Sequence, residues 1–155
     1  MEVSENAGES LDLRFLSLTS LPNLGQLREL RHLNLTDCQL HKLAENPPVA
    51  QVFFNALGQL NNLQTLNLSN NNLGRLAENP QVAKAFAKGL SQLRNLQTLN
   101  LNNNNLDRLA ENTQAVQVFA NCLAQLHQLQ SFTLIGDNLG KLCGNAQVAP
   151  LLPTV

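Results

Sequence analysis

The chain has 155 residues, about the length of one ordinary domain, and its 10 Lys and Arg residues nearly balance its 11 Asp and Glu residues. Proteins that bind nucleic acid through its phosphates usually carry a basic excess, so a net charge of −1 argues against a nucleic-acid partner. Trp and Tyr are absent and Phe occurs six times, so we expect an aliphatic core.

The first ten residues are acidic and polar, without the basic and apolar regions of a secretory signal. No apolar run approaches the ~18 residues of a membrane span, so no membrane insertion is expected. Cys38, Cys122 and Cys143 are odd in number and widely spaced, which favours buried thiols in a reducing compartment. We therefore expect a cytoplasmic chain, monomeric when alone, with a flexible segment over residues 1–10.

A leucine pattern of the form L-x-x-L-x-L-x-x-N/C-x-L starts at Leu30, Leu63, Leu96 and Leu129, an interval of 33 residues each time. A shorter copy precedes them, with Leu13, Leu16, Leu18 and Leu21. Within each copy, the alternation x-L-x-L predicts a short strand with its leucines pointing inward. We expect a single domain over residues 11–155 with one short repeat, about four full repeats and a C-terminal cap.

A helix is predicted between successive strands. Asn46, Asn79 and Asn112 are suited to cap its N-terminus, and Pro47 and Pro80 suit the first helical position. Apolar residues then follow the 3.6-residue period of a helix that packs one face on the sheet.

The ninth position of the repeat holds Asn71 and Asn104, replaced by Cys38 in one copy and Asp137 in another. We expect the Asn side chain to be buried in the turn after the strand, bonding backbone groups of its own and the next repeat. Cys suits the position because its S–H group is a weak donor.

The last repeat departs from the pattern. Asn145 is suited to cap a helix, but Pro150 and Pro153 would break it. The apolar residues at the C-terminus are expected to cover the open end of the core; the alternative is that the array continues in a longer protein.

These residues resemble leucine-rich-repeat proteins of the ribonuclease-inhibitor-like β/α type, over roughly Leu11 to Leu142. The Asn-rich repeats and their LAENP segments also resemble leucine-rich-repeat effectors of intracellular bacterial pathogens, which implies secretion into a host cell's cytoplasm. The resemblance implies an α/β solenoid, curved, with a parallel β-sheet on its concave face and α-helices on its convex face. Partners, usually proteins, are expected to dock on the concave face.

Stacking turns each strand position into a row across the concave face. One predicted row is Phe15, His32, Thr65, Thr98 and Ser131, and the next includes Asn34, Asn67 and Asn100. The charged and aromatic residues gather at the N-terminal end, which favours binding there, and Ile135 is an exposed apolar residue at the other end. The predicted protein-binding residues are Arg14, Phe15, Arg31, His32, Asn34, Asp37, Asn67, Asn100 and Ile135. Two alternatives remain open: a merely solvated Asn and Thr surface between the ends, and a Phe15 that folds over the edge of the core.

A basic row recurs outside the strands and is followed three residues later by Glu. Its members are Lys42, Arg75, Arg108 and Lys141, with Glu45, Glu78 and Glu111. Such mixed ladders are usually solvated salt-bridge surfaces, although an acidic partner would make this row the second candidate contact.

No enzymatic chemistry is predicted. The best catalytic candidates are Cys38, His41 and Asp37, with His32 nearby, but Cys38 occupies a buried repeat position where an inert thiol is expected. No metal-ligand spacing or phosphate-binding loop is present, so no metal or cofactor is expected. The sequence therefore favours a protein-binding module, plausibly a regulator or inhibitor of a partner enzyme. The alternative is a structural or targeting fragment of a larger protein.

Overall fold

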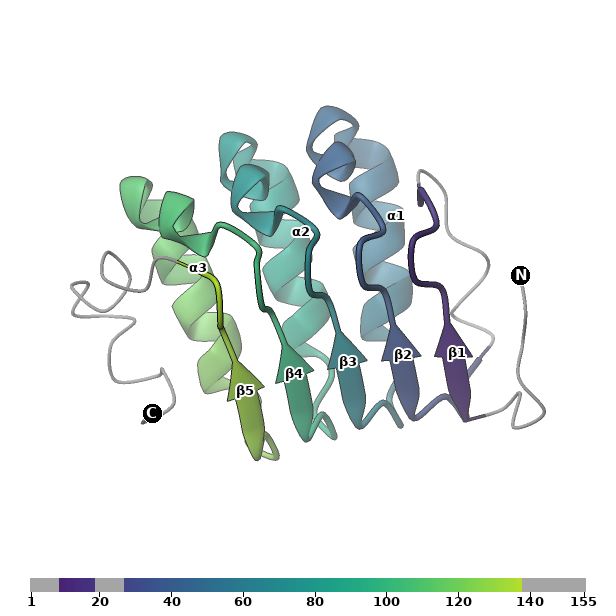
Figure 1. The fold of residues 1–155 in the computed structure, drawn as a ribbon. Coiled ribbons are helices and arrows are strands. Elements are labelled where there is room, and N and C mark those ends of the chain that lie inside the picture. Colours follow the sequence, from purple (N-terminus) through teal and green to yellow (C-terminus); the bar gives the residue numbers. More distant parts are fainter. Residues whose placement is uncertain (1–8, 19–26, 138–155) are drawn as a thin grey trace.

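Five short strands form one parallel sheet in the computed structural model of the chain, which describes residues 9–18 and 27–137. The strands are β1 (Ser10–Asp12), β2 (His32–Asn34), β3 (Thr65–Asn67), β4 (Thr98–Asn100) and β5 (Ser131–Thr133), in chain order across the sheet (Figure 1). From β2 to β5 the register follows the repeat interval, so that His32 pairs with Thr65 and Thr65 pairs with Thr98. The phase predicted for the four full repeats is confirmed.

A 3-10 helix and then an α-helix connect each strand from β2 onward to the next, and the α-helices all cover the same face of the sheet (Figure 1). The α-helices are α1 (Pro47–Gly58), α2 (Pro80–Ser91) and α3 (Thr113–Ala124), and the 3-10 helices are η2 (Leu40–Glu45), η3 (Leu73–Glu78) and η4 (Leu106–Glu111). The predicted N-caps are confirmed, because the side-chain oxygens of Asn46, Asn79 and Asn112 each accept a hydrogen bond from the first turn of the helix. The leucine pattern gives no sign of the 3-10 helices.

The first repeat occupies a different phase from the predicted one. Leu11 pairs with Leu33, and the Glu9 carbonyl oxygen accepts hydrogen bonds from the backbone N–H groups of Arg31 and His32. Ser10, not Phe15, therefore lies beside His32 in the row, so the predicted place of Phe15 is wrong. Because β1 includes Ser10, the sheet also begins one residue before the expected domain start.

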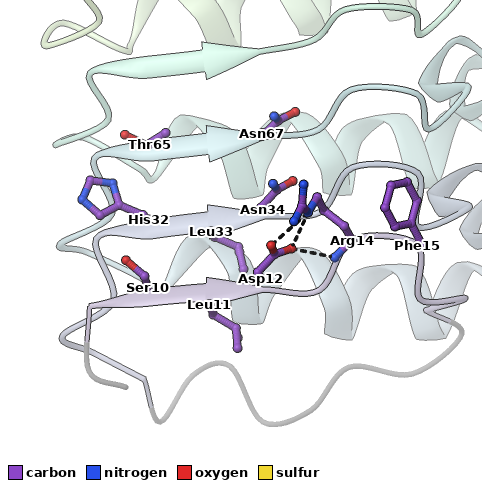
Figure 2. A pocket seen from close by; sticks show the side chains of 10 residues that line it. All are labelled: Ser10, Leu11, Asp12, Arg14, Phe15, His32, Leu33, Asn34, Thr65 and Asn67. Carbon is purple, nitrogen blue, oxygen red and sulfur yellow. Dashed lines mark hydrogen bonds and ion pairs between the residues drawn. The ribbon is translucent and has the colours of Figure 1, made fainter. Parts of the chain in front are cut away.

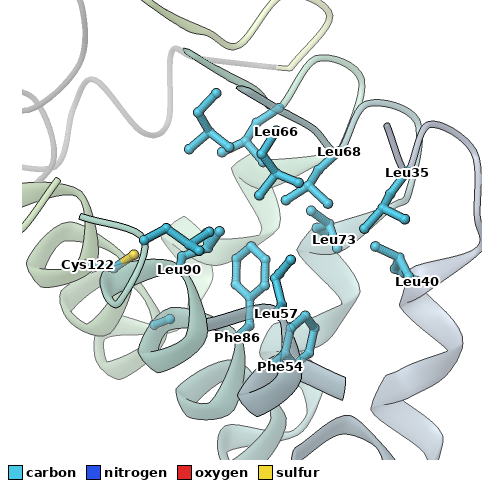
Figure 3. Packing of buried hydrophobic residues seen from close by; sticks show 14 of the residues in the cluster. Leu35, Leu40, Phe54, Leu57, Leu66, Leu68, Leu73, Phe86, Leu90 and Cys122 are labelled. Atoms are coloured by element: carbon cyan, nitrogen blue, oxygen red, sulfur yellow. The ribbon is translucent and has the colours of Figure 1, made fainter. Parts of the chain in front are cut away.

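Leucines from the strands and helices fill the space between the sheet and the helices (Figure 3). Phe53 and Phe54 of α1 and Phe86 of α2 add aromatic contacts, the first pair within α1 and the second between α1 and α2. Successive ring centroids in this group lie 5.2 and 5.3 Å apart with edge-to-face geometry, a favourable arrangement for aromatic pairs. One continuous core thus joins the repeats, as expected when a single repeat cannot bury its leucines alone.

Buried side chains at the ninth repeat position join neighbouring repeats. The Asn71 Oδ1 atom accepts hydrogen bonds from the backbone N–H groups of Cys38 and Leu40, and its Nδ2 atom donates to the Leu35 carbonyl oxygen. These partners belong to the preceding repeat, so the predicted link to the next repeat runs in the wrong direction. The Cys38 thiol lies 3.0 Å from the Leu13 carbonyl oxygen and donates to it, which confirms that Cys can replace the Asn donor.

Several expectations fall partly or wholly outside the described residues: the flexible segment over residues 1–10, the Leu21 position of the first copy, Cys143, the C-terminal cap, and the Lys141 member of the basic row. Of the rest of that row, the half-buried Arg75 and the exposed Arg108 each lie 3.5 Å from the same oxygen of the exposed Glu78. Such pairs stabilise a fold by only ~0–1 kcal/mol. Within the described part of the chain, no helix has the length and apolar character needed to cross a membrane.

Candidate functional site

The open face of the sheet carries side chains in rows that the register defines. One row is Ser10, His32, Thr65, Thr98 and Ser131, and the next is Asp12, Asn34, Asn67, Asn100 and Thr133. The strand leucines between these residues point into the core. The α-helices cover the opposite face of the sheet. The polar side chains on the concave face are therefore not covered by helices and can contact a partner.

A shallow hollow of about 580 Å³ lies at the N-terminal end of this face. Figure 2 shows its lining side chains, which come from β1, the turn after β1, β2 and β3. They are Ser10, Leu11, Asp12, Arg14, Phe15, His32, Leu33, Asn34, Thr65 and Asn67. The hollow brings together five of the predicted binding residues: Arg14, Phe15, His32, Asn34 and Asn67.

Arg14 is held in place by Asp12. Its Nε atom lies 2.9 Å from Asp12 Oδ2, and the Asp12 Oδ1 atom also accepts a hydrogen bond from the Arg14 backbone N–H group. The guanidinium carbon lies 5.9 Å from the centre of the Phe15 ring, within the range of a cation–π contact. The first repeat thus presents a positioned cation and an aromatic ring side by side. Sequence reasoning missed Asp12, because the wrong phase of the first repeat did not place it in a strand row.

Phe15 is both exposed and held in an unfavourable backbone conformation. Its side chain is 70% exposed, which contradicts the alternative in which it folds over the core edge. Its φ angle is 66°, in the left-handed region that suits Gly, Asn and Asp. The residues at the same place in the other repeats are of those types and share that region: Asp37, Asn70, Asn103 and Gly136. A left-handed conformation costs a residue such as Phe ~1–2 kcal/mol, and such strain clusters at functional sites.

The predicted Asn row is confirmed in position, and each of its members closes the turn after its strand. The Oδ1 atoms of Asn34, Asn67 and Asn100 accept hydrogen bonds of 2.9–3.0 Å from the backbone N–H group two residues later. The hydroxyl groups of Thr36 and Ser69 donate to the same oxygens of Asn34 and Asn67. The acceptor atom of each amide is therefore used inside the protein.

The other predicted site residues lie around this surface. Arg31 is exposed immediately before β2, and Asp37 is exposed in the left-handed turn after it. Ile135 follows β5 and is 72% exposed. Because β5 is the second strand beyond β3, the last strand that lines the hollow, Ile135 lies ~10 Å across the sheet from its edge, so the structure does not bring it to the same site.

The residues considered for catalysis form no reactive group. Burial raises the pKa of the Cys38 thiol to about 11, and its S–H bonds to a backbone carbonyl oxygen, so the reactive thiolate is disfavoured. His41 is half-buried on η2 with its Nδ1 atom buried and without a partner among the described residues. Those residues also contain no group of three His, Cys, Asp or Glu side chains able to hold a metal ion.

Comparison with known families agrees with this architecture. The Leucine Rich Repeat family profile matches residues 62–82 and 95–115, which cover β3 and β4 with the turns and helix starts that follow them. The chain folds as a leucine-rich-repeat solenoid. No curated protein matches it significantly. Leucine-rich repeats generally form non-enzymatic scaffolds for protein–protein interaction, and the polar concave face of this solenoid suits that role.

Proposed function

We propose that this leucine-rich-repeat solenoid binds a partner protein on its concave face, with the main contact at the N-terminal hollow. The observation that carries the proposal is Phe15. An exposed aromatic ring in a left-handed turn lowers both solubility and stability, and a binding role explains why the position is not occupied by Asn, Asp or Gly. Aromatic and Arg side chains are also the residues most often responsible for binding energy in interfaces.

Within this class, a regulator or inhibitor that covers a partner enzyme's surface is the specific function we favour. The sheet offers a surface five strands wide, ~19 Å between its outer strands, and its polar rows would exclude water around an anchored partner. The buried thiols Cys38 and Cys122 support a reducing, cytoplasmic setting for this interaction.

The test compares proteins captured from cell lysates by the native chain and by a Phe15→Asn variant. Asn fits the left-handed turn, so this change removes the ring while preserving the fold. Val52→Gln is the matched control, because Val52 is also 70% exposed but lies on α1, on the convex face.

We expect a partner that the native chain and the Val52→Gln variant capture and that the Phe15→Asn variant does not. Capture of the same proteins by all three chains would contradict a site at the hollow. If the partner is an enzyme, its activity at saturating concentrations of the chain separates the two roles: a regulator changes the activity, whereas a scaffold leaves it unchanged.

A further inference from the structure

The Asn row on β2, β3 and β4 presents its amide nitrogens as hydrogen-bond donors, because each amide oxygen already accepts a hydrogen bond from the turn after its strand. The backbone N–H groups that face Asn34, Asn67 and Asn100 are donors only, so the atom that meets each of them must be the side-chain oxygen. The amide nitrogen must then point away from the turn, as Figure 2 shows for Asn34 and Asn67. Within the described residues these nitrogens donate no hydrogen bond, and none is buried without a partner. Three amide groups therefore offer their hydrogens to the space above the sheet.

Asp12 shows that a carboxylate fits the same row position. Asp12 pairs with Asn34 in the register, and its Oδ1 atom accepts from the backbone N–H two residues later, as the Asn oxygens do. Its outer oxygen, Oδ2, is bound by Arg14 and is not left to repel an anion. At one end of the row, the Asp12 carboxylate is therefore paired with Arg14. The three middle positions carry Asn side chains that present amide donors. Arg31 is exposed beside the row and adds one cation, and the exposed Asp37 on the turn after β2 carries the opposite charge.

The distance between the amide donors can be compared with the spacing of acceptor side chains along a helix or a strand of a partner. Three neighbouring strands place the first and third donors ~9.6 Å apart. In an α-helix, residues i and i+7 rise ~10.5 Å along the axis, with i+3 or i+4 between them on the same face. In an extended strand, three side chains of one face span ~13 Å, which overshoots the row.

We propose that the partner lays an acidic α-helix across β2, β3 and β4. Asp or Glu side chains at positions i, i+3 or i+4, and i+7 accept hydrogen bonds from the Nδ2 atoms of Asn34, Asn67 and Asn100. Hydrogen bonds from a neutral donor to a carboxylate are among the stronger ones in proteins, and a regular row of three specifies both the charge of the helix and the line along which its axis lies. This inference rests on the proposed function, because it names the chemistry of the partner for the same concave face.

The experiment uses a helix-stabilised, alanine-based peptide of ~17 residues, a length at which a helix can persist in water. Its three Glu residues stand at i, i+4 and i+7. A second peptide has the same composition with its Glu residues at i, i+2 and i+5, spread around the helix. Each is titrated into the isotope-labelled native chain and its variants. NMR, which detects weak binding, follows the backbone amide signals of β2, β3 and β4 in every chain, and the side-chain amide signals of Asn34, Asn67 and Asn100 where those residues are present.

The deciding variant changes the three Asn residues of the row to Asp (N34D/N67D/N100D). Each Asp keeps the oxygen that closes the turn but replaces the outer donor with an acceptor, as Asp12 illustrates. The control adds the same charge to exposed positions on the convex helices: Asn55→Asp, Gln117→Glu and Asn121→Asp.

We expect the first peptide to shift the three side-chain amide signals of the native and control chains. The row variant should bind it about tenfold more weakly or worse, since bonds to a charged group are lost. Equal binding of both peptides, equal binding by the row variant, or no binding to the native chain would each overturn the acidic helix. The proposed function is tested separately, by the capture experiment. It still holds after any of those outcomes if capture of a partner depends on Phe15, and it is contradicted if capture does not depend on Phe15.

Discussion

The buried side chains at the ninth repeat position, which bond one repeat to the next, form what we call the buried ladder. Asp137 allows a test of this ladder, because changing it to Asn replaces only one oxygen by an NH₂ group. It stands at the ninth repeat position, where Asn71 and Asn104 donate from Nδ2 to backbone carbonyl oxygens. The Asp137 Oδ1 atom accepts from the backbone N–H groups of Asn104 and Leu106, at 3.0 and 2.9 Å. Its Oδ2 atom is buried and has no partner among the described residues. An Asp137→Asn variant would replace this unpaired acceptor with a donor.

The expected gain in the free energy of unfolding is about 2 kcal/mol at neutral pH. Each new hydrogen bond from the Asn Nδ2 atom should contribute a net ~1 kcal/mol, and removal of the buried, unpaired Oδ2 acceptor should contribute as well. Imperfect geometry of the new bonds should offset part of this gain. At low pH the gain should shrink, because a protonated Asp137 can itself donate from Oδ2.

The pH dependence follows from the carboxyl group. Burial raises the pKa of Asp137 above its ordinary value, although hydrogen bonds from the N–H groups of Leu106 and Asn104 oppose the change. A group whose pKa is higher in the folded state stabilises the fold fully below its unfolded pKa, and this contribution is lost as the pH rises through the folded pKa. The native chain should therefore lose stability over that range, and the Asp137→Asn variant should not.

Urea unfolding followed by circular dichroism, at about pH 3 and about pH 7, measures the difference on either side of the ordinary carboxyl range. Asp37→Asn is the matched control, since Asp37 is exposed in a left-handed turn where other repeats carry Asn; its effect should stay within ~0.5 kcal/mol. A gain that does not depend on pH, or no gain at neutral pH, would refute the ladder argument.

Three further outcomes are expected. Phe15→Asn should raise the free energy of unfolding by ~1 kcal/mol in urea titrations, because it relieves the left-handed strain; a loss would show that the ring packs on the fold. In a Cys143→Ser background, Cys122 should resist alkylation at pH ~8 until the chain unfolds, because burial raises its pKa to about 12; labelling of the native chain would contradict this. Gly89→Ala should lower the thermal midpoint although Ala favours helices by ~1 kcal/mol, because its Cβ would overlap the Phe54 carbonyl oxygen of α1; a higher midpoint would show that the helices separate freely.

The leucine spacing and the Asn caps predicted the repeated part of the fold well, because the same residues recur at the same positions in each full repeat. The caps at Asn46, Asn79 and Asn112 lie where the Asn residues precede an apolar helical stripe, and the strand phase of the full repeats follows the leucines. The 3-10 helices were not predictable from that pattern. They follow left-handed residues at Gln39, Asn72 and Asn105. The first N–H group of each 3-10 helix donates to a side-chain oxygen of the next repeat, a contact between repeats that the spacing of the leucines does not contain.

The first repeat was predicted in the wrong phase because its leucines fit the pattern in two ways. Leu11, Leu13, Leu16 and Leu18 match the spacing of Leu33, Leu35, Cys38 and Leu40. The set Leu13, Leu16, Leu18 and Leu21 matches that of Leu30, Leu33, Leu35 and Cys38 equally well. Backbone pairing of Glu9 with β2 decides between them, and periodicity carries no information on that pairing. The same error hid Asp12 and the left-handed turn at Phe15, so the candidate site was predicted by residue type but not by geometry.

The central claim is that a partner binds the concave face at its N-terminal hollow. Chemical-shift mapping of the isotope-labelled chain with its captured partner tests this most directly. We expect the largest shifts at Phe15, His32, Asn34 and Asn67, with α1 around Val52 unchanged. Shifts confined to the convex helices, with the hollow unchanged, would contradict the claim.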